Sequence, residues 1–302
     1  MAVQQTSKNI VLFKYNGTPT VADVLTLDGN VFINPKVGSG EYKEVGNGFM
    51  GNTKSFVDEH HVTAAFDISV NIKKSTAGTP PSISSLLKAS GLSETITAGA
   101  SVSYMVGGTL SPSQAIVYID GYKRAVTGVY TNFKITGKVG EIAKSTFSAS
   151  GASDMVSVAE SNPTVTLDTN VVVIVSKVSA VTVGGTSVNC TDFEFDLGNK
   201  INEIYAMGQS EYYLEDFSPT LTLTAIKVKG TDEQAWVDFG MGAIKEIIIT
   251  LGAGAGGVVE LKASNCVLNE VTESDDAGKV KIVRKFKAQA NIGNDNFSLT
   301  WK

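Results

Sequence analysis

The chain has 302 residues with 42% hydrophobic side chains, which excludes a disordered protein and leaves room for two domains that each bury a core. Its formal net charge of −5 is small and its basic residues form no stripe, which argues against tight, specific nucleic-acid binding. The two cysteines, Cys190 and Cys266, lie far apart in apolar strand patterns and predict buried free thiols rather than a zinc site or a disulfide.

The N-terminal region predicts short strands separated by turns. Residues 10–14 form one alternating run, Asn16-Gly17 marks a turn, and residues 26–35 predict a hairpin-like element around Asp28-Gly29. The first residues contain no long apolar stretch and no small-residue cleavage site, so we expect neither a secretory signal nor a membrane span, and folding in a cytoplasm.

Two segments, 36–60 and 198–216, are too long for ordinary loops of a compact domain and carry many large apolar side chains. We expect these two arms to be covered by a neighbouring subunit, because an exposed apolar segment of this length is unfavourable in water. The candidate inter-subunit residues are Phe49, Met50, Phe56, Ile201, Ile204, Tyr205, Met207, Tyr212, Tyr213 and Leu214.

A strand followed by a short helix occurs twice. Residues 62–72 alternate apolar and polar side chains, as does the run LTLT at 221–224. The first helix is predicted over 82–90, after two prolines and before a glycine, and the second begins at the capping box TDEQ, 231–234. Each helix has two or three turns and must lie against a sheet to be stable.

Further strands follow each helix. The first copy continues with SVSYMV, AIVYIDG, VYTNFKIT and KSTFSASG, and the second with EIIITLG, GVVELKA, NCVLNEVT and VKIVRKFKAQA. We therefore predict a mainly β protein with a segment 1–24, a first β domain 25–154, connecting strands 155–184 and a second β domain 185–302. Within the connection, the apolar run 171–178 predicts a strand buried on both faces.

Candidate chemical sites are weak. The glycine-rich run 252–257 precedes a strand rather than a helix, so it predicts a hairpin tip and not a phosphate loop. His60 and His61 point to opposite faces of an extended chain and have no third ligand at metal spacing. The chain has no hydrolase or calcium-loop motif, so we predict no enzyme, no metal and no cofactor.

One strand carries an acidic face. Asp192, Glu194 and Asp196 alternate with two phenylalanines, so the three carboxylates line one face. They form either an acidic wall with a role or an ordinary solvated strand face, and the residues alone do not decide between these two interpretations.

The stretch AGTPPSISSLLKASGLSETITAGASVSY, residues 77–104, resembles bacteriophage tail tube proteins, also called major tail proteins. The matching residues are Gly78, Thr79, Pro81, Leu86, Leu87, Ala89, Gly91 and Tyr104. The stretch CTDFEFDLGNKI, residues 190–201, with the arm and strand after it, is also similar to this family. The resemblance extends from about residue 22 to the C-terminus. It implies two tandem tube-type β-sandwich or barrel domains, each with a short flanking helix and a long arm.

The resemblance also implies a function. Such proteins join sheet edges into rings that stack into a hollow tail tube, a conduit for DNA ejection. A chain with two units would close a pseudo-six-fold ring from three copies. The expected partners are other copies, then tape measure, terminator and distal tail proteins, with DNA only transiently in an acidic or neutral lumen, and no membrane. We expect assembly in the host bacterial cytoplasm and a final location in the virion tail. The alternative is a tail-tip or surface β-sandwich module that binds a receptor or glycan.

Overall fold

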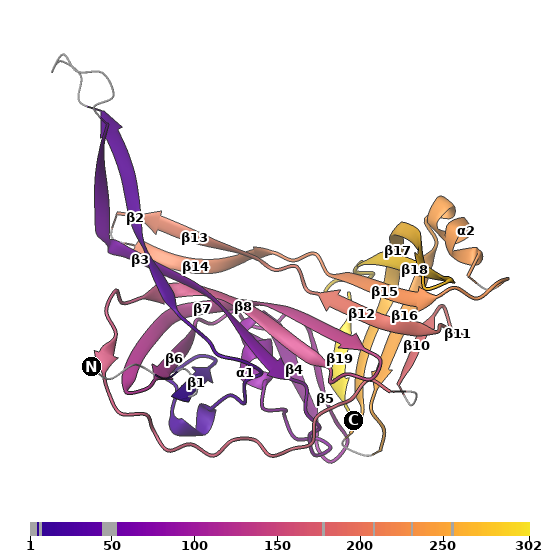
Figure 1. Ribbon diagram of the computed structural model, residues 1–302, viewed down its shortest axis with the longest axis horizontal. Coiled ribbons are helices and arrows are strands. Elements are labelled where there is room, and N and C mark those ends of the chain that lie inside the picture. The colour runs from indigo at the N-terminus through magenta and orange to yellow at the C-terminus, as the bar shows by residue number, and fades with distance from the viewer. Residues whose placement is uncertain are drawn as a thin grey trace.

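The computed structural model describes residues 5, 8–43, 53–176, 179–207, 209–230, 232–254 and 257–302. The protein is mainly β, as predicted, with two α-helices among these described residues (Figure 1). Nearly all strands belong to one antiparallel sheet of 17 strands, and β13 and β14 form a separate pair. The sheet curls into a sandwich-like body rather than a closed barrel.

The N-terminal half contains nine strands and two short helical segments. They are β1 (Asn9–Lys14), η2 (Val21–Asp23), β2 (Asn34–Lys43), β3 (Thr53–Asn71), α1 (Ser84–Ala89), β4 (Leu92–Thr97), β5 (Ser101–Val106), β6 (Ser113–Ile119), β7 (Tyr122–Lys138), β8 (Lys144–Ser153) and β9 (Val158–Ala159).

The C-terminal half contains ten strands and one helix. They are β10 (Ala180–Val183), β11 (Thr186–Ser187), β12 (Cys190–Asp196), β13 (Lys200–Ala206), β14 (Gln209–Asp216), β15 (Thr220–Ile226), α2 (Gln234–Met241), β16 (Ile244–Leu251), β17 (Val259–Asp276), β18 (Lys279–Ala288) and β19 (Ser298–Trp301).

The two halves pair their strands in the same order. In the first half the order is β1–β6–β7–β8–β3–β2. In the second half it is β10–β16–β17–β18–β15–β12. The runs GVVELKA and NCVLNEVT, which we predicted as two strands, are one long strand, β17, just as β7 is one long strand in the first half.

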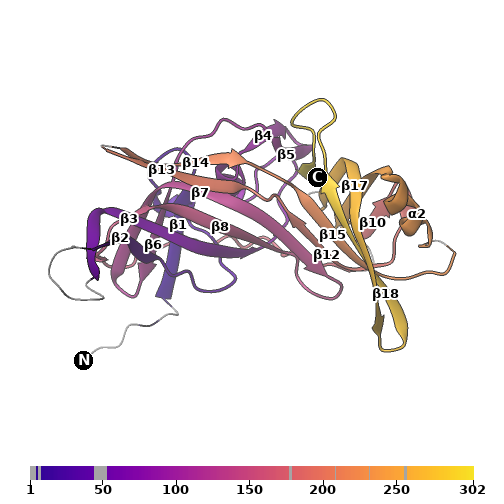
Figure 2. The same cartoon turned by 90° about the horizontal axis from the view of Figure 1, so that it is seen from above.

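Two seams join the halves into one sheet. The C-terminal end of β7 pairs with β12, and the last strand, β19, lies between β5 and β17. Figure 2 shows the sheet running from β3, β8 and β7 directly into β12, β15 and β18. The buried side chains of both halves accordingly form one main core cluster rather than two separate ones.

The predicted alternation explains how the sheet buries this core. Phe66, Ile68 and Val70 of β3 are buried, whereas Ala65 and Asp67 between them are exposed. Along the second half, Leu221 and Leu223 are buried while the intervening threonines remain accessible. Because successive side chains of a strand point to opposite faces, each of these strands has one apolar face and one polar face.

The two helices differ in burial. α1 is shorter than predicted, and its Leu86 and Leu87 are fully buried. α2 buries only Ala235 and ends at Gly242, whose left-handed φ of 62° favours glycine. The capping box predicted for α2 includes Thr231, which lies outside the described residues.

Three predictions of local structure were wrong. The described part of the run 171–178, residues 171–176, forms no strand buried on both faces, because Val171 and Ile174 are 66% and 50% exposed while Val173 between them is buried. Residues 26–35 form no hairpin, since residues 28 and 29 form a bend and residues 34 and 35 already belong to β2, which pairs with β3. The arms are not loops, because each is a β-hairpin in its described part, β2–β3 and β13–β14. Tertiary pairing overrode local patterns in all three cases.

A buried polar cluster holds α1 against the sheet. Glu94 accepts hydrogen bonds from Ser84 Oγ and from the hydroxyl of the buried Tyr104, both at 2.6 Å. Burial would raise the pKa of Glu94, but these hydrogen bonds and the Lys88 ammonium outweigh it and lower that pKa below its ordinary value. The ionised carboxylate therefore stabilises the fold.

Replacing Glu94 with Gln should lower the free energy of unfolding by about 1–3 kcal/mol at neutral pH, since a charge-assisted hydrogen-bond acceptor is lost. A carboxyl whose folded pKa is lowered contributes stability above its unfolded pKa and loses it as the pH falls through the folded pKa. The gap between the wild type and Glu94→Gln in urea unfolding should therefore narrow toward acid pH. A gap that is constant from pH 7 to pH 3 contradicts this assignment.

Candidate assembly surfaces

The seam between β7 and β12 is a regular antiparallel ladder. Its register places Lys134 opposite Asp196, Thr136 opposite Glu194, and Lys138 opposite Asp192. Gly137 is required there, because a Cβ at this position would lie 2.3 Å from Cε1 of Phe193. The sequence predicted both strands but gave no signal that they pair with each other across the chain.

Opposite charges reinforce this seam on its polar face. Lys134 Nζ lies 2.9 Å from a Glu194 carboxylate oxygen and 3.7 Å from one of Asp196. The hydrogen bond to Glu194 raises the pKa of Lys134. Asn132 Nδ2 also donates to Asp196 at 2.9 Å. These contacts are partly exposed, so they contribute more to register than to stability.

Aromatic side chains close the apolar side of the seam. The ring centroids of Phe133 and Phe195 lie 6.0 Å apart, and those of Phe195 and Phe297 lie 4.7 Å apart. All three side chains are buried. Because Phe133 belongs to the first half and the other two belong to the second, the seam is part of the common core.

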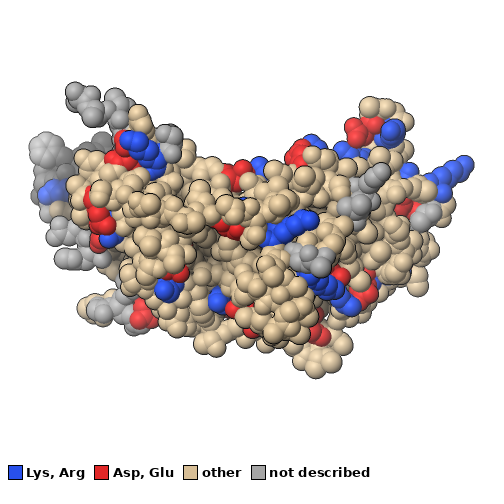
Figure 3. All heavy atoms as spheres, turned by 90° about the horizontal axis from the view of Figure 1, so that it is seen from below, with Lys and Arg blue, Asp and Glu red and all other residues tan. Residues whose placement is uncertain are grey.

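The three predicted acidic residues do share the polar face of β12, beside an open groove of about 410 Å³ that follows the seam. They do not form an isolated acidic patch. Lys134 and Lys138 flank them on β7, threonines of β15 lie on the other side, and exposed lysines of β18 follow. The surface seen from below has the same character, with charges of both signs scattered among uncharged residues (Figure 3). The role of Asp192, Glu194 and Asp196 in lining a channel stays a prediction.

The second arm, β13–β14, lies across the first half of its own chain (Figure 1). At its base, Asn199 Nδ2 donates to the carbonyl oxygens of Ser90 and Thr131 at 2.8 and 2.9 Å. Leu214 packs at the glycine that ends α1, since a Cβ on Gly91 would lie 3.2 Å from Leu214 Cδ1. The arm therefore docks on the C-terminal end of α1 and on β7.

Farther out, the same arm contacts the long strand β3. The His61 ring stacks on Tyr205 with centroids 3.9 Å apart, and His61 Nε2 lies 2.8 Å from a Glu203 carboxylate oxygen. The Tyr205 hydroxyl also donates to Asp58. The sequence predicted no role for His61, and only its proximity in the fold to the second arm gives it one.

The remaining predicted arm residues are placed as follows. Ile201, Tyr212 and Leu214 are half-buried, whereas Phe56, Ile204, Tyr205, Met207 and Tyr213 are exposed. Phe49 and Met50 lie outside the described residues. Part of the apolar surface of the second arm is thus covered within the chain itself, and the contacts of the exposed residues with a neighbour stay a prediction.

A family model for phage tail tube proteins matches residues 16–296 of the chain, which is nearly its whole length. This chain belongs to the phage tail tube protein family. A comparison with curated proteins gave no match. A tail tube protein is a structural component of the virion tail and associates with copies of itself and with other tail proteins.

Among the strand edges that this tail tube protein leaves open, in the part of the chain that the structure describes, are those of β2 and of the end of β17. β2 pairs with β3 on one side only, and β17 beyond Leu268 pairs only with β18. Open edges present unpaired N–H and C=O groups and favour pairing with another chain. The first arm, β2–β3, projects away from the body next to one of these edges (Figure 1).

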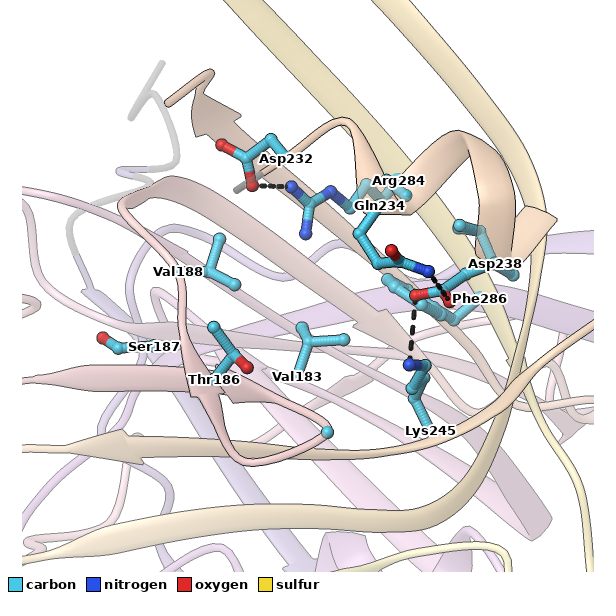
Figure 4. A pocket seen from close by; sticks show the side chains of 13 residues that line it. Val183, Thr186, Ser187, Val188, Asp232, Gln234, Asp238, Lys245, Arg284 and Phe286 are labelled. Atoms are coloured by element: carbon cyan, nitrogen blue, oxygen red, sulfur yellow. Dashed lines mark hydrogen bonds and ion pairs between the residues drawn. The ribbon is translucent and has the colours of Figure 1, made fainter. Parts of the chain in front are cut away.

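A small cavity of about 90 Å³ lies between α2 and the turn from β10 to β11 (Figure 4). Arg284 of β18 donates to Asp232, and both side chains are buried. Lys245 Nζ lies 3.2 Å from an Asp238 carboxylate oxygen on the helix. Because these charges are paired with each other, they hold α2 in place rather than form an ion-binding site.

Other chemistry is limited among the described residues. They contain no cluster of His, Cys, Asp or Glu side chains that could hold a metal ion. None of their helices has the length and apolar character needed to cross a membrane. Both cysteines are free, and burial raises the pKa of Cys190 to about 11 and that of Cys266 to about 12, so neither is a reactive thiolate at neutral pH.

The core shared across the seam predicts that both halves of the tail tube protein unfold together in one transition. Phe195→Ala should lower the free energy of unfolding by about 3–5 kcal/mol, because it opens a cavity in the common core. Glu194→Gln, on the exposed face of the same strand, is the matched control and should cost less than about 1 kcal/mol. Guanidinium unfolding followed by fluorescence should show one transition in each variant. Two transitions, with only the second-half transition shifted by Phe195→Ala, would contradict a shared core.

Proposed function

We propose that each chain supplies two equivalent tube units to one ring, that three chains close a pseudo-six-fold ring, and that stacked rings form the conduit for DNA ejection. The observation that carries this proposal is the seam between β7 and β12, together with the matching open edges of β17 and β2. The seam supports the proposal because it joins the two halves of one chain, and the open edges would allow the same join between chains.

The equivalence of the units rests on their register. We align Thr63 with Thr220, since β3 and β15 hold the same place in the strand order and each threonine directly precedes a buried residue, Ala64 or Leu221. The residue opposite Thr63 on β2 is Lys36, and the residue opposite Thr220 on β12 is Asp196. Each is followed by an aliphatic residue and a glycine, Val37-Gly38 and Leu197-Gly198, where the strand leads into its arm.

The same alignment, carried through β8 and β18, relates residues of β17 to residues of β7. Thr146 of β8 lies opposite Lys134, and its equivalent on β18, Lys281, lies opposite Ser274. In the seam Lys134 faces Asp196, so in the ring Ser274 of one chain should face Lys36 of the next. Asp276 should then face Asn34 and lie diagonal to Lys36.

Charge supports this register. Within the chain, a lysine on β7 meets two carboxylates on β12. Between chains, Lys36 on β2 would lie diagonal to Asp276 on the same face of β17, so the signs are exchanged but still opposite. Opposite charges across a joint favour the correct partner and register.

The polar face of this sheet is the proposed lumen wall. The acidic residues of β12 lie between lysines of β7 and β18, so the wall presents alternating charges rather than a continuous basic surface. A wall without a dominant positive field releases few counterions from DNA and holds the duplex weakly. That property suits a conduit through which DNA must slide.

A double variant tests the join between chains. Lys36→Cys with Ser274→Cys should form intermolecular disulfides in assembled protein, because directly opposed residues in antiparallel strands lie about 4.5–5.5 Å apart at Cα, within disulfide reach. Non-reducing electrophoresis should show a ladder that ends at the covalently closed trimer. The native cysteines should add little cross-link, since Cys266 is buried, Cys190 is half-buried, and the raised pKa of each keeps its thiol protonated at neutral pH.

The control pairs Lys36→Cys with Glu273→Cys, whose side chain points to the opposite face of β17. It should cross-link much less than the first pair under the same conditions. Tubes or rings that form without any disulfide at Ser274 would contradict this edge pairing, and a ladder that ends at the hexamer would contradict the three-chain ring.

A further inference from the structure

The C-terminal end of α2 exposes several apolar side chains. Met241 and Ile244 are 78% and 61% exposed on either side of Gly242, and Phe239 is 41% exposed. From the arrangement within the chain, we infer that this α2 patch (Phe239, Met241 and Ile244) receives the first arm, β2–β3, of the neighbouring copy in the ring. This inference rests on the proposed ring.

The internal interface provides the reason. The second arm docks on the first unit at the end of α1, where Leu214 packs at Gly91. Gly242 directly follows α2, Gly91 follows α1 after Ser90, and both glycines have a positive φ, 62° and 83°. If units repeat around a ring, the arm that enters from the next unit must reach Gly242 as the second arm reaches Gly91.

The arms match at this place in sequence, while across each hairpin Leu214 lies opposite Ile201 and Val57 lies opposite Ser39. Counting back six residues from the equivalent threonines, Thr63 and Thr220, leads to Val57 and Leu214. The local sequences are Phe-Val-Asp-Glu at 56–59 and Tyr-Leu-Glu-Asp at 213–216, each an aromatic residue, an aliphatic residue and two acids. Val57 therefore takes the place of Leu214 in the contact between chains.

Leu214 and Val57 differ in how far their side chains are buried. Leu214 is half-buried by the first unit of its own chain, beside an apolar cavity of about 230 Å³ that Leu92, Val106 and Leu110 help to line. Val57 is 66% exposed and Phe56 is 53% exposed. The arm and the α2 patch thus each expose apolar side chains at the positions that meet in the internal counterpart.

The orientation of α2 is compatible with this contact. The buried pair of Arg284 and Asp232 fixes the N-terminal end of the helix to β18, and Lys245 pairs with Asp238 below it (Figure 4). The α2 patch at the other end of the helix is thereby presented outward. An arm that enters along the open edge of β17 would pass directly over it, because β17 packs beneath α2.

The test is a cysteine pair, Val57→Cys with Met241→Cys, oxidised in assembled protein and compared with unassembled protein. We expect a disulfide between different chains, formed at least ten times faster in tubes or rings than in dispersed chains. Electron microscopy of the same samples reports assembly independently. Rings or tubes that form normally without this disulfide overturn the arm contact and leave the ring proposal intact.

Two controls separate the remaining outcomes. Val57→Cys with Ile96→Cys places the second thiol on an exposed first-half residue, 50% exposed in β4, and should not cross-link. Met241→Cys alone should also give no dimer, and a disulfide there would identify a symmetric contact between two α2 helices, which overturns the inference. Chains that never form rings or tubes under any condition would overturn both the ring and the arm contact.

Discussion

The structure depends on the hydrogen-bonding requirement of strand edges. Inside the chain, the edge of β7 is satisfied by β12, and the resulting seam merges two six-strand arrays into one sheet with one core. Each backbone N–H and C=O group on an open edge needs a partner or water. β2 and the end of β17 keep open edges in the described part of the chain, and we propose that these edges make between chains the join that β7 and β12 make internally.

This constraint also explains the differences between the two units. α1 is buried against β1, β4 and β7, and the second arm of the same chain reaches its C-terminal end, whereas the C-terminal end of α2 is exposed. The first arm contacts the second arm through Asp58 and projects from the body. The electrostatic pattern agrees with this account, since the lysine of the internal seam lies on β7 and the lysine at the open edge lies on β2.

Much of the fold was predictable from the sequence, but the arrangement of the halves was not. Alternation identified β3 and β15, and proline and glycine bounded α1 to within two residues. The prediction of a buried strand at 171–178 was wrong, because a β-branched composition is typical both of buried strands and of extended segments that form only isolated bridges. The apolar arms indicated a covered surface, but only the fold showed that Asn199 and Leu214 cover their own chain. Contacts such as His61 with Tyr205 join residues far apart in sequence, and no local pattern encodes them.

The central claim is that both units of each chain lie in the same ring. The rotational symmetry of assembled tubes, measured by electron cryomicroscopy with the mass per ring, tests it most directly. The account predicts three chains per ring, with true three-fold symmetry and six similar but distinguishable lobes. Six chains per ring, with one unit of each chain outside the wall, would contradict it.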